Sequence, residues 1–330
     1  MFGRSWIFVA HASELAGAGE DLVVRAFFSA CRHRGAPVVR DECGTCKLLV
    51  CQYHSWSYDH SGRLVRVPDE RDFVSLQPDE RALVSVRCEA WGDWLFVNLD
   101  ADATPLVDWL GPLTSELGDV ASADCRVITR LSTTHRCNEV YHAKTIHAAT
   151  VANVLRPGGA AISLIDNGHS RMLTPLADAV MEGGRDSHRS LPAIDGLGEL
   201  YDITNPAFGI FPNLITPLDR VGFPILQFWP EAVDRTRLER IWIAPTAGVE
   251  PQRHPTWDRR LDAFEVVMGE DTKNLEPIQR SVESAAHGGI PLNYQERRIW
   301  HFHATIDKTI GPDLVPPDLR VADLLADWVD

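Results

Sequence analysis

The first hundred residues consist of short apolar runs separated by turns. The runs are rich in Val, Leu and Trp, and clear examples are residues 47–50, 63–67 and 91–97. Gly, Asp and Ser lie between them, and short runs bounded by such residues are typical of β-strands. We therefore predict a small antiparallel β domain over residues 1–105.

The pattern changes after this first part of the chain. Pro and Gly recur over residues 101–124, which predicts a linker with one short helix. Residues 134–155 favour a helix, and residues 179–206, rich in Gly and Asp, favour a loop that is either a pocket wall or a surface excursion. Strand-like segments occupy residues 127–131, 171–174, 209–216, 223–229 and 238–244.

A long amphipathic helix is predicted over residues 257–284. Its apolar residues recur at helical spacing and form one stripe; they are Trp257, Leu261, Phe264, Met268 and Leu275. Pro277 should kink or divide this helix. For residues 106–330 we therefore expect an antiparallel sheet folded around one long C-terminal helix, and the fold class of the whole chain is α+β.

Composition narrows the possible functions. The chain has 330 residues, of which 45% are hydrophobic, so it can bury a core. Its formal net charge of −14 argues against binding to nucleic acid or to an anionic membrane. No apolar run approaches the roughly 20 residues that a membrane span needs, and the N-terminus does not resemble a signal peptide. We expect a cytoplasmic protein.

The cysteines point to metal binding. There are seven, and four of them lie between Cys31 and Cys51. An odd number crowded in this way, without an export signal, favours metal ligation over a disulfide framework.

Two segments offer one thiolate and one imidazole each. They are Cys31-Arg-His33 and Cys51-Gln-Tyr-His54, with 17 residues between them. Two Cys and two His are the ligands of a Rieske [2Fe–2S] cluster, in which two imidazoles replace two thiolates and raise the reduction potential. Zinc is the alternative, although its common sites pair Cys with Cys and His with His.

A second cysteine motif lies between these segments. Cys43-Gly-Thr-Cys46 could be a zinc knuckle or a redox pair. Together with Cys31 and Cys51 it could form a four-Cys site, but His33 and His54 would then have no role. The alternative is two spare thiols on a connecting loop.

A second metal site is predicted further along the chain. His142 and His147 lie in a helical context, roughly 140° apart on an ideal helix. Both reach one metal only if the helix is distorted or one His is near its end. Glu139, one turn earlier, can accept the ring N–H of a ligand His. Two ordinary hydrogen-bonded histidines are the alternative.

Asp271 continues the apolar stripe of the C-terminal helix, so it should point inward. A buried carboxylate is costly unless it is paired or bound to metal. Two His and one carboxylate are the ligand set of non-haem Fe(II) oxygenases. A buried ion pair with an Arg is the other interpretation of Asp271.

Nearly the whole chain resembles the α subunits of Rieske non-haem iron ring-hydroxylating oxygenases. The resemblance rests on the two cluster segments, on Glu139-Val-Tyr-His142 with His147, and on residues 270–279. It implies a helix-grip (START-like) catalytic domain after the Rieske domain. By this resemblance the iron ligands are His142, His147 and Asp271, and Glu139 bridges to a cluster His of the next subunit in a ring, commonly a trimer.

Two departures from the family are visible. A hairpin before the first cluster segment looks largely missing around residues 17–25, and Thr129-Arg-Leu131 stands where Asn-Trp-Lys is typical. Neither departure touches a predicted metal ligand.

The resemblance implies an oxygenase that uses O₂ to hydroxylate, dihydroxylate or demethylate a small molecule. No dinucleotide fingerprint occurs, so NAD(P)H electrons should arrive through a separate reductase, with or without a ferredoxin. Apolar pocket candidates favour an aromatic or hydrophobic substrate, although a quaternary amine is conceivable. These candidates are Phe208, Phe211, Phe223 and Phe228. His169 could line the pocket or be a satisfied core residue. A pure electron carrier and a zinc-binding interaction protein are the rival functions.

Overall fold

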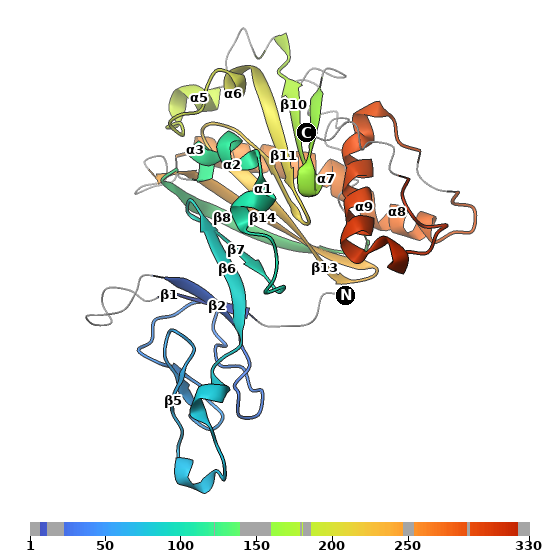
Figure 1. The fold of residues 1–330 in the computed structure, drawn as a ribbon. Coiled ribbons are helices and arrows are strands. Elements are labelled where there is room, and N and C mark those ends of the chain that lie inside the picture. Colours follow the sequence, from blue (N-terminus) through green and yellow to red (C-terminus); the bar gives the residue numbers. More distant parts are fainter. Residues whose placement is uncertain are drawn as a thin grey trace. The chain divides into compact units, whose positions relative to one another are not determined.

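The computed structural model describes residues 7–11, 23–121, 123–138, 160–178, 180, 186–246, 254–288 and 291–322. The chain divides into two compact units, residues 1–108 and 109–330, which we describe separately (Figure 1). The sequence-based prediction placed the domain boundary after residue 105.

The first unit contains two antiparallel sheets. One has four strands in the order β1-β2-β6-β7, and the other has three in the order β3-β4-β5. The bounds of the larger sheet are β1 Ile7–His11, β2 Val24–Phe28, β6 Ser85–Trp91 and β7 Trp94–Asn98. Those of the smaller sheet are β3 Leu49–Val50, β4 Ser57–Tyr58 and β5 Leu64–Arg66. Two short 3₁₀ helices follow β5, η2 Glu70–Asp72 and η3 Pro78–Arg81.

The run at residues 91–97 is a hairpin tip and not one strand. Trp91 pairs with Trp94, so the chain turns through two residues, and Gly92 takes the positive φ of 57° that such a turn requires. Further upstream, β1 pairs with β2, from Ile7 opposite Phe28 to His11 opposite Val24. A strand pair therefore does precede the first cluster segment.

The core of the first unit surrounds the predicted cluster residues. Phe27, Cys31, Cys51, Trp56 and Tyr58 are all buried in it. β5 and its turn close over this core through Gly62, where a Cβ would lie 2.5 Å from the Phe27 ring. The core is therefore built around the two thiols.

The second unit is built on a seven-stranded antiparallel sheet in the order β8-β14-β13-β12-β11-β10-β9. The strands are β8 Cys125–His135, β9 Ala161–Ile165, β10 His169–Pro175, β11 Thr204–Ile210, β12 Leu214–Pro217, β13 Phe223–Ala232 and β14 Arg235–Pro245. The short 3₁₀ helix η5 Asp166–Gly168 connects β9 to β10. Sequence order and spatial order agree except at β8, which pairs with β14.

Three sequence-based predictions of secondary structure were wrong in detail. β8 continues to His135, so no helix begins at Thr134. Residues 209–216 are not one strand, because β11 ends at Ile210 and β12 begins at Leu214. Residues 101–124 hold three short helices instead of one, α1 Leu106–Leu110, α2 Leu113–Glu116 and α3 Gly118–Ala121.

The predicted C-terminal helix packs on the sheet as α7, Thr256–Thr272, and α8, Leu275–Val282. Trp257 and Phe264 of α7 contact Trp242 of β14, with ring centroids 6.0 and 5.2 Å apart. The helix is divided at Lys273 and Asn274, not at Pro277 itself. Pro277 lies in the first turn of α8, where its missing N–H costs nothing, and its ring would clash with the carbonyl of Lys273 in a continuous helix.

A further helix was missed. α9, Arg297–Ile310, packs against β9 and η5 beside the β9–β10 edge of the sheet (Figure 1). It is preceded by the 3₁₀ turn η7, Tyr294–Glu296, whose Asn293 and Glu296 form a reciprocal capping box. A short 3₁₀ turn, η8 Pro312–Leu314, follows α9. With antiparallel sheets in both units and helices packed on the second sheet, the α+β fold class is confirmed.

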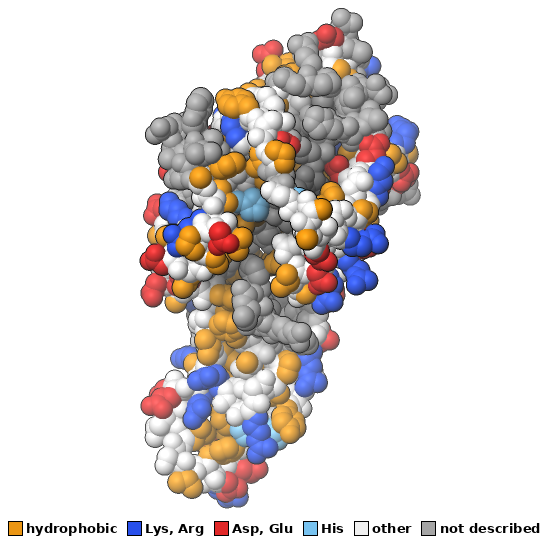
Figure 2. Space-filling view, turned by 90° about the vertical axis from the view of Figure 1, so that its right-hand side faces the viewer, with side chains coloured by type: hydrophobic (Ala, Val, Ile, Leu, Met, Phe, Trp, Pro, Cys, Tyr) orange, Lys and Arg blue, Asp and Glu red, His pale blue; other side chains and the backbone are white. Residues whose placement is uncertain are grey.

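The surface carries mixed charge. On the face shown in Figure 2, acidic side chains are interspersed with basic ones. None of the helices in the described ranges combines the length and apolar character needed to cross a bilayer.

Candidate metal centres

Cys31 and Cys51 begin two loops of the same backbone design. In each loop the Cys N–H donates to the carbonyl five residues later, Ala36 or Trp56, at 2.8 and 2.9 Å. The Cys carbonyl accepts from the N–H four residues later, Gly35 or Ser55, at the same two distances. Gly35 and Ser55 both take positive φ, 75° and 59°. The two loops thus present their side chains in equivalent ways.

The loops bring like donors together. Cys31 and Cys51 are buried, and burial raises the pKa of the Cys31 thiol, with Cys51 as a further contributor. The rings of His33 and His54 lie 4.7 Å apart, and burial, followed by the His54 charge, lowers the pKa of His33. A thiol pair and an imidazole pair are the donors that a His-ligated two-iron cluster needs.

The fit to a cluster also shows in an unsatisfied atom. His33 Nδ1 is buried and has no hydrogen-bond partner among the described residues. Buried polar atoms are normally paired, so a buried imidazole nitrogen without a partner is suited to bind a metal.

Three aromatic residues surround these donors. Tyr58 Oη lies 3.2 Å from Cys31 Sγ and accepts the N–H of Arg32 at 2.9 Å, which leaves its own proton free to donate to the sulfur. Trp56 stacks on His33 with an interplanar angle of 8°, and Phe73 meets His33 edge-on. Tyr58 and Trp56 follow the second motif closely in sequence, whereas Phe73 carries no local signal that could have identified it.

Cys43 and Cys46 do not join the buried thiols. Both are exposed, while Cys31 and Cys51 are buried. Within the described ranges no three Cys, His, Asp or Glu side chains converge on one point suited to a single ion. The four-Cys interpretation therefore finds no support in the geometry.

The predicted second metal site is only partly visible. Glu139, His142 and His147 lie outside the described residues. Asp271 is in the last turn of α7 and half-buried, and its Oδ2 is buried without a hydrogen-bond partner among described residues. Burial, followed by the charge of Glu270, raises the pKa of Asp271 to about 6. The buried Arg ion pair that was the alternative is not formed within the described part of the chain.

The chain leading to Glu139 runs beside the start of α8. Buried Cys137 packs with Leu275, and the backbone N–H of Asn138 donates to Gln279 at 2.6 Å. The residue directly before Glu139 is therefore tied to the helix that follows Asp271.

His169 is a satisfied core residue. Its Nδ1 accepts the N–H of Phe211 at 3.1 Å, so its Nε2 carries the proton and donates to the Trp109 carbonyl at 3.0 Å. Burial lowers its pKa to about 4. Both nitrogens are thus occupied by backbone groups.

The four predicted pocket phenylalanines separate into two kinds. Phe208 and Phe223 are buried, so they belong to the core of the second unit. Phe211 is half-buried and packs against Phe302, and half-buried Phe228 packs near Met268 and Leu275. All four stay predicted pocket residues, and the second pair has ring surface that is exposed to a ligand.

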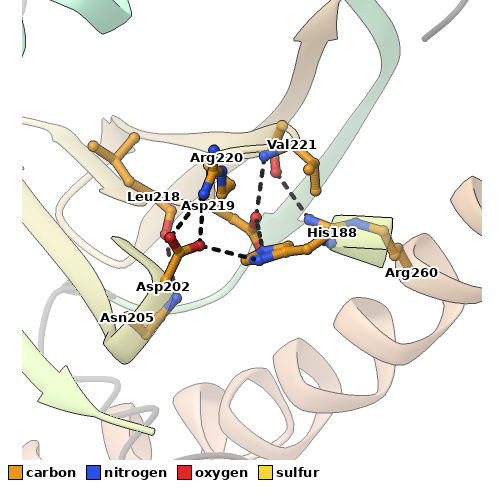
Figure 3. A network of polar contacts seen from close by, with 9 residues as sticks. His188, Asp202, Asn205, Leu218, Asp219, Arg220, Val221 and Arg260 are labelled. Carbon is orange, nitrogen blue, oxygen red and sulfur yellow. Dashed lines mark hydrogen bonds and ion pairs between the residues drawn. The ribbon is translucent and has the colours of Figure 1, made fainter. Parts of the chain in front are cut away.

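The stretch predicted as a loop, residues 179–206, is partly structured. Its described part contains α5 Asp186–Ser190, α6 Leu200–Ile203 and the start of β11. Figure 3 shows the network that holds it: His188 Nε2 lies 2.8 Å from Asp219, and Arg220 pairs with Asp202 at 2.7 Å. Arg260 of α7 reaches the same Asp219 at 3.4 Å. These contacts join α5 and α6 to α7 and the β12–β13 connection, so this part is not a free surface excursion.

Family models match both units. The Rieske [2Fe-2S] domain matches residues 5–78, and the ring hydroxylating alpha subunit catalytic domain matches residues 133–311. The chain belongs to the ring-hydroxylating alpha-subunit family. As a member, this α subunit has a Rieske [2Fe–2S] cluster and a mononuclear iron. The residue-by-residue ligand assignment remains a prediction.

Curated relatives of this α subunit act on different compounds. The biphenyl 2,3-dioxygenase subunit alpha of Rhodococcus jostii (strain RHA1) is 36% identical over 129 residues, covering 34% of this chain and 28% of the relative. The carnitine monooxygenase oxygenase subunit of Escherichia coli (strain K12) is 29% identical over 175 residues, covering 44% of this chain and 47% of the relative. The matches thus span less than half the length of either relative.

Solved structures share the fold. The quaternary ammonium Rieske monooxygenase CntA has a TM-score of 0.70 at 18% identity, covering 88% of this α subunit and 79% of that chain. The naphthalene 1,2-dioxygenase from Rhodococcus sp. has a TM-score of 0.61 at 21% identity, covering 82% and 72%. The shared architecture includes both the Rieske unit and the sheet with its helices.

Proposed function

We propose that the chain is the catalytic subunit of a Rieske oxygenase, which uses O₂ and externally supplied electrons to hydroxylate, dihydroxylate or demethylate a small organic molecule. The observation that carries this proposal is the paired arrangement of donors, Cys31 with Cys51 and His33 with His54, in one unit of a chain whose other unit belongs to the catalytic-domain family.

For the cluster we propose Cys31 and Cys51 as ligands of one iron, and His33 and His54 as ligands of the other. The equivalent loops, the burial of the thiols and the unpaired Nδ1 of His33 support this assignment. Tyr58 donates a hydrogen bond to Cys31 and so stabilises negative charge on that sulfur.

For the mononuclear iron we propose His142, His147 and Asp271 as ligands. Support for Asp271 comes from its buried, unpaired Oδ2. Its raised pKa reflects the cost of burying a carboxylate without a partner, and a bound cation would offset that cost. This feature favours an oxygenase over the pure electron carrier, which has no use for such a carboxylate.

When bound, the cluster supplies single electrons and the mononuclear iron supplies O₂ activation. The chain positions the reacting groups: α7 fixes the backbone of Asp271, and Phe211 and Phe228 offer apolar surface to a substrate. An aromatic or hydrophobic compound is the substrate class that this surface suits, and a quaternary amine over an aromatic face is the alternative.

The partners follow from the same proposal. Electrons from NAD(P)H come through a separate reductase, with or without a ferredoxin. Glu139 connects the mononuclear site of one subunit to the cluster of the next, in a homotrimer. The protein acts in the cytoplasm.

Iron content tests the function. The wild type should hold about three irons per chain, whereas an electron carrier should hold two. His142→Ala should lose the third iron and substrate-dependent O₂ uptake, assayed with a surrogate reductase and a panel of aromatic acids and methylated amines. The visible cluster spectrum should persist. Loss of the cluster colour in the same variant would contradict separate sites.

A further inference from the structure

A short segment, Arg136–Asn138, is fixed from two sides directly before the predicted iron-binding residues. From α8, Glu276 Oε1 accepts the N–H of Arg136 at 3.3 Å, and Gln279 Oε1 accepts the N–H of Asn138 at 2.6 Å. Two side chains of α8 thus bind the backbone of one short segment that lies about 140 residues earlier in the sequence.

The sheet holds the same segment from the other side. The hydroxyl of Thr236, on β14, lies 3.0 Å from the carbonyls of both Cys137 and Asn138. The Asn138 side chain donates to the Val233 carbonyl in the turn between β13 and β14. Between these polar contacts, the buried Cys137 side chain packs with Leu275 and Phe228.

The geometry of this segment points to a role for two side chains that bind no metal. We infer that Glu276 and Gln279 are positioning residues for the mononuclear iron, because they hold Arg136 and Asn138, which directly precede the proposed ligands in the sequence, against the helix that follows Asp271. The inference rests on the ligand set proposed above.

The argument depends on how the ligands are distributed. Asp271 lies in the last turn of α7, and Glu276 and Gln279 lie on α8, which begins three residues after α7 ends, so all three belong to one helical stretch of chain. His142 and His147 follow Asn138 by four and nine residues. A metal needs all its ligands at fixed distances, so any freedom between residues 138 and 271 weakens the site. The two hydrogen bonds from α8 restrict that freedom.

Each bond uses a backbone donor, so truncating the side chain leaves an N–H without its acceptor. Gln279→Met removes no charge, whereas Glu276→Met removes one, and Glu276→Gln removes the same charge but keeps an acceptor. Gln279 also donates to Glu283 at 2.9 Å, which is a contact within α8 alone. This second contact offers a matched control, because Glu283→Ala removes the intrahelical bond and leaves the one to Asn138.

The test compares Gln279→Met, Glu276→Met, the conservative Glu276→Gln and the control Glu283→Ala in the full chain. Fe(II) affinity of the mononuclear site is measured by competition with a chromogenic chelator, and the cluster is quantified by its visible and paramagnetic resonance spectra. Gln279→Met and Glu276→Met should each weaken Fe(II) binding about fivefold, on the order of one net hydrogen bond. Glu276→Gln, which keeps an acceptor, and Glu283→Ala should match the wild type, and cluster spectra should not change.

Hydrogen–deuterium exchange supplies a second measurement that needs no metal. The amides of residues 136–138 should exchange faster in the two Met variants than in the controls. Faster exchange with unchanged Fe(II) affinity would overturn the positioning role, as would equal weakening by Glu283→Ala. If the wild type itself holds only two irons, the proposed function fails first, and the inference falls with it.

Discussion

The hydrogen bond from Tyr58 to Cys31 should affect the reduction potential of the cluster. Tyr58 is fully buried, and burial together with the Cys31 contact raises its pKa, so it stays a neutral donor at any physiological pH. A donor to a ligand sulfur stabilises the electron-rich reduced cluster more than the oxidised one, and so raises the reduction potential.

Tyr58→Phe should therefore lower the reduction potential of the cluster. Loss of one hydrogen bond corresponds to a shift on the order of 50 mV for a one-electron couple. A redox titration followed by visible circular dichroism measures it. Tyr53→Phe is the control, because Tyr53 is exposed and contacts the His54 ring through its own ring. Equal potentials for Tyr58→Phe and wild type would exclude the sulfur hydrogen bond as a determinant.

At the scale of elements, His169 joins three parts of the second unit. It begins β10, its Nε2 reaches Trp109 in α1, and its Nδ1 reaches the residue after β11. The N–H of Phe211 points at Nδ1, so a second ring proton has no acceptor there. Burial lowers the pKa of the ring to about 4, so the ring is neutral, in agreement with an Nδ1 that accepts a hydrogen bond.

Because the pKa of His169 is lower in the folded chain than in the unfolded chain, acidification reduces the free energy of unfolding. The unfolded chain binds the proton near pH 6.5 and the folded chain near pH 4, so this contribution is present above about pH 6.5 and is lost as pH falls towards 4. Between pH 7 and pH 5 the loss amounts to about 2 kcal/mol.

Urea unfolding of wild type and His169→Gln at both pH values measures it. The variant should be less stable at pH 7, but its stability should fall by about 2 kcal/mol less on acidification to pH 5. Since other groups titrate equally in both proteins, the difference isolates this histidine. Parallel pH dependences would show that the ring nitrogens are not held as described.

Elements that depend on local sequence were predicted better than those that depend on distant contacts. The strand-rich first unit was predicted from short apolar runs between turn residues, and α7 from apolar residues at helical spacing. The break before Asn274 was misplaced because a proline acts on the carbonyl four residues earlier. α5 and α6 were missed because charges on β12–β13 and α7 stabilise them, as His188 with Asp219 shows (Figure 3). α9 did have a local signal, the capping box at Asn293 and Glu296.

In the candidate sites, too, residues in local motifs were predicted, whereas residues placed only by tertiary contacts were not. The cluster donors are two short motifs, and in the folded unit the rings of His33 and His54 lie 4.7 Å apart while Cys31 and Cys51 are both buried. Their assignment as cluster ligands stays a prediction. Asp271 was predicted from one apolar stripe, and its half-buried, unpaired carboxylate agrees with an inward orientation. By contrast, Phe73 beside His33 and Gln279 beside Asn138 depend on tertiary contacts, which spacing along the sequence does not encode.

At the scale of the whole molecule, the proposed bridge makes electron transfer a property of the assembly. If Glu139 connects the mononuclear site of one subunit to the cluster of the next, each iron receives electrons from a neighbouring chain. Glu139→Gln should then retain both metals, since it is not proposed as a ligand, but single-turnover reduction of the mononuclear site should slow strongly. An unchanged rate would refute the bridge.

Mixed oligomers separate transfer between subunits from transfer within one. Cys51→Ser removes a proposed cluster ligand and His142→Ala a proposed ligand of the mononuclear iron, so each variant alone should be inactive. Co-expressed in one cell, they form assemblies in which an intact cluster on one chain can serve an intact mononuclear site on its neighbour. Substrate-dependent O₂ uptake should therefore return to a fraction of the wild-type level. Mixing the two purified, preassembled variants should restore none, because neither assembly contains both kinds of intact site. If co-expression also restores no activity while purification through a different affinity tag on each variant recovers mixed trimers, electrons travel within each chain and the intersubunit role of Glu139 is wrong.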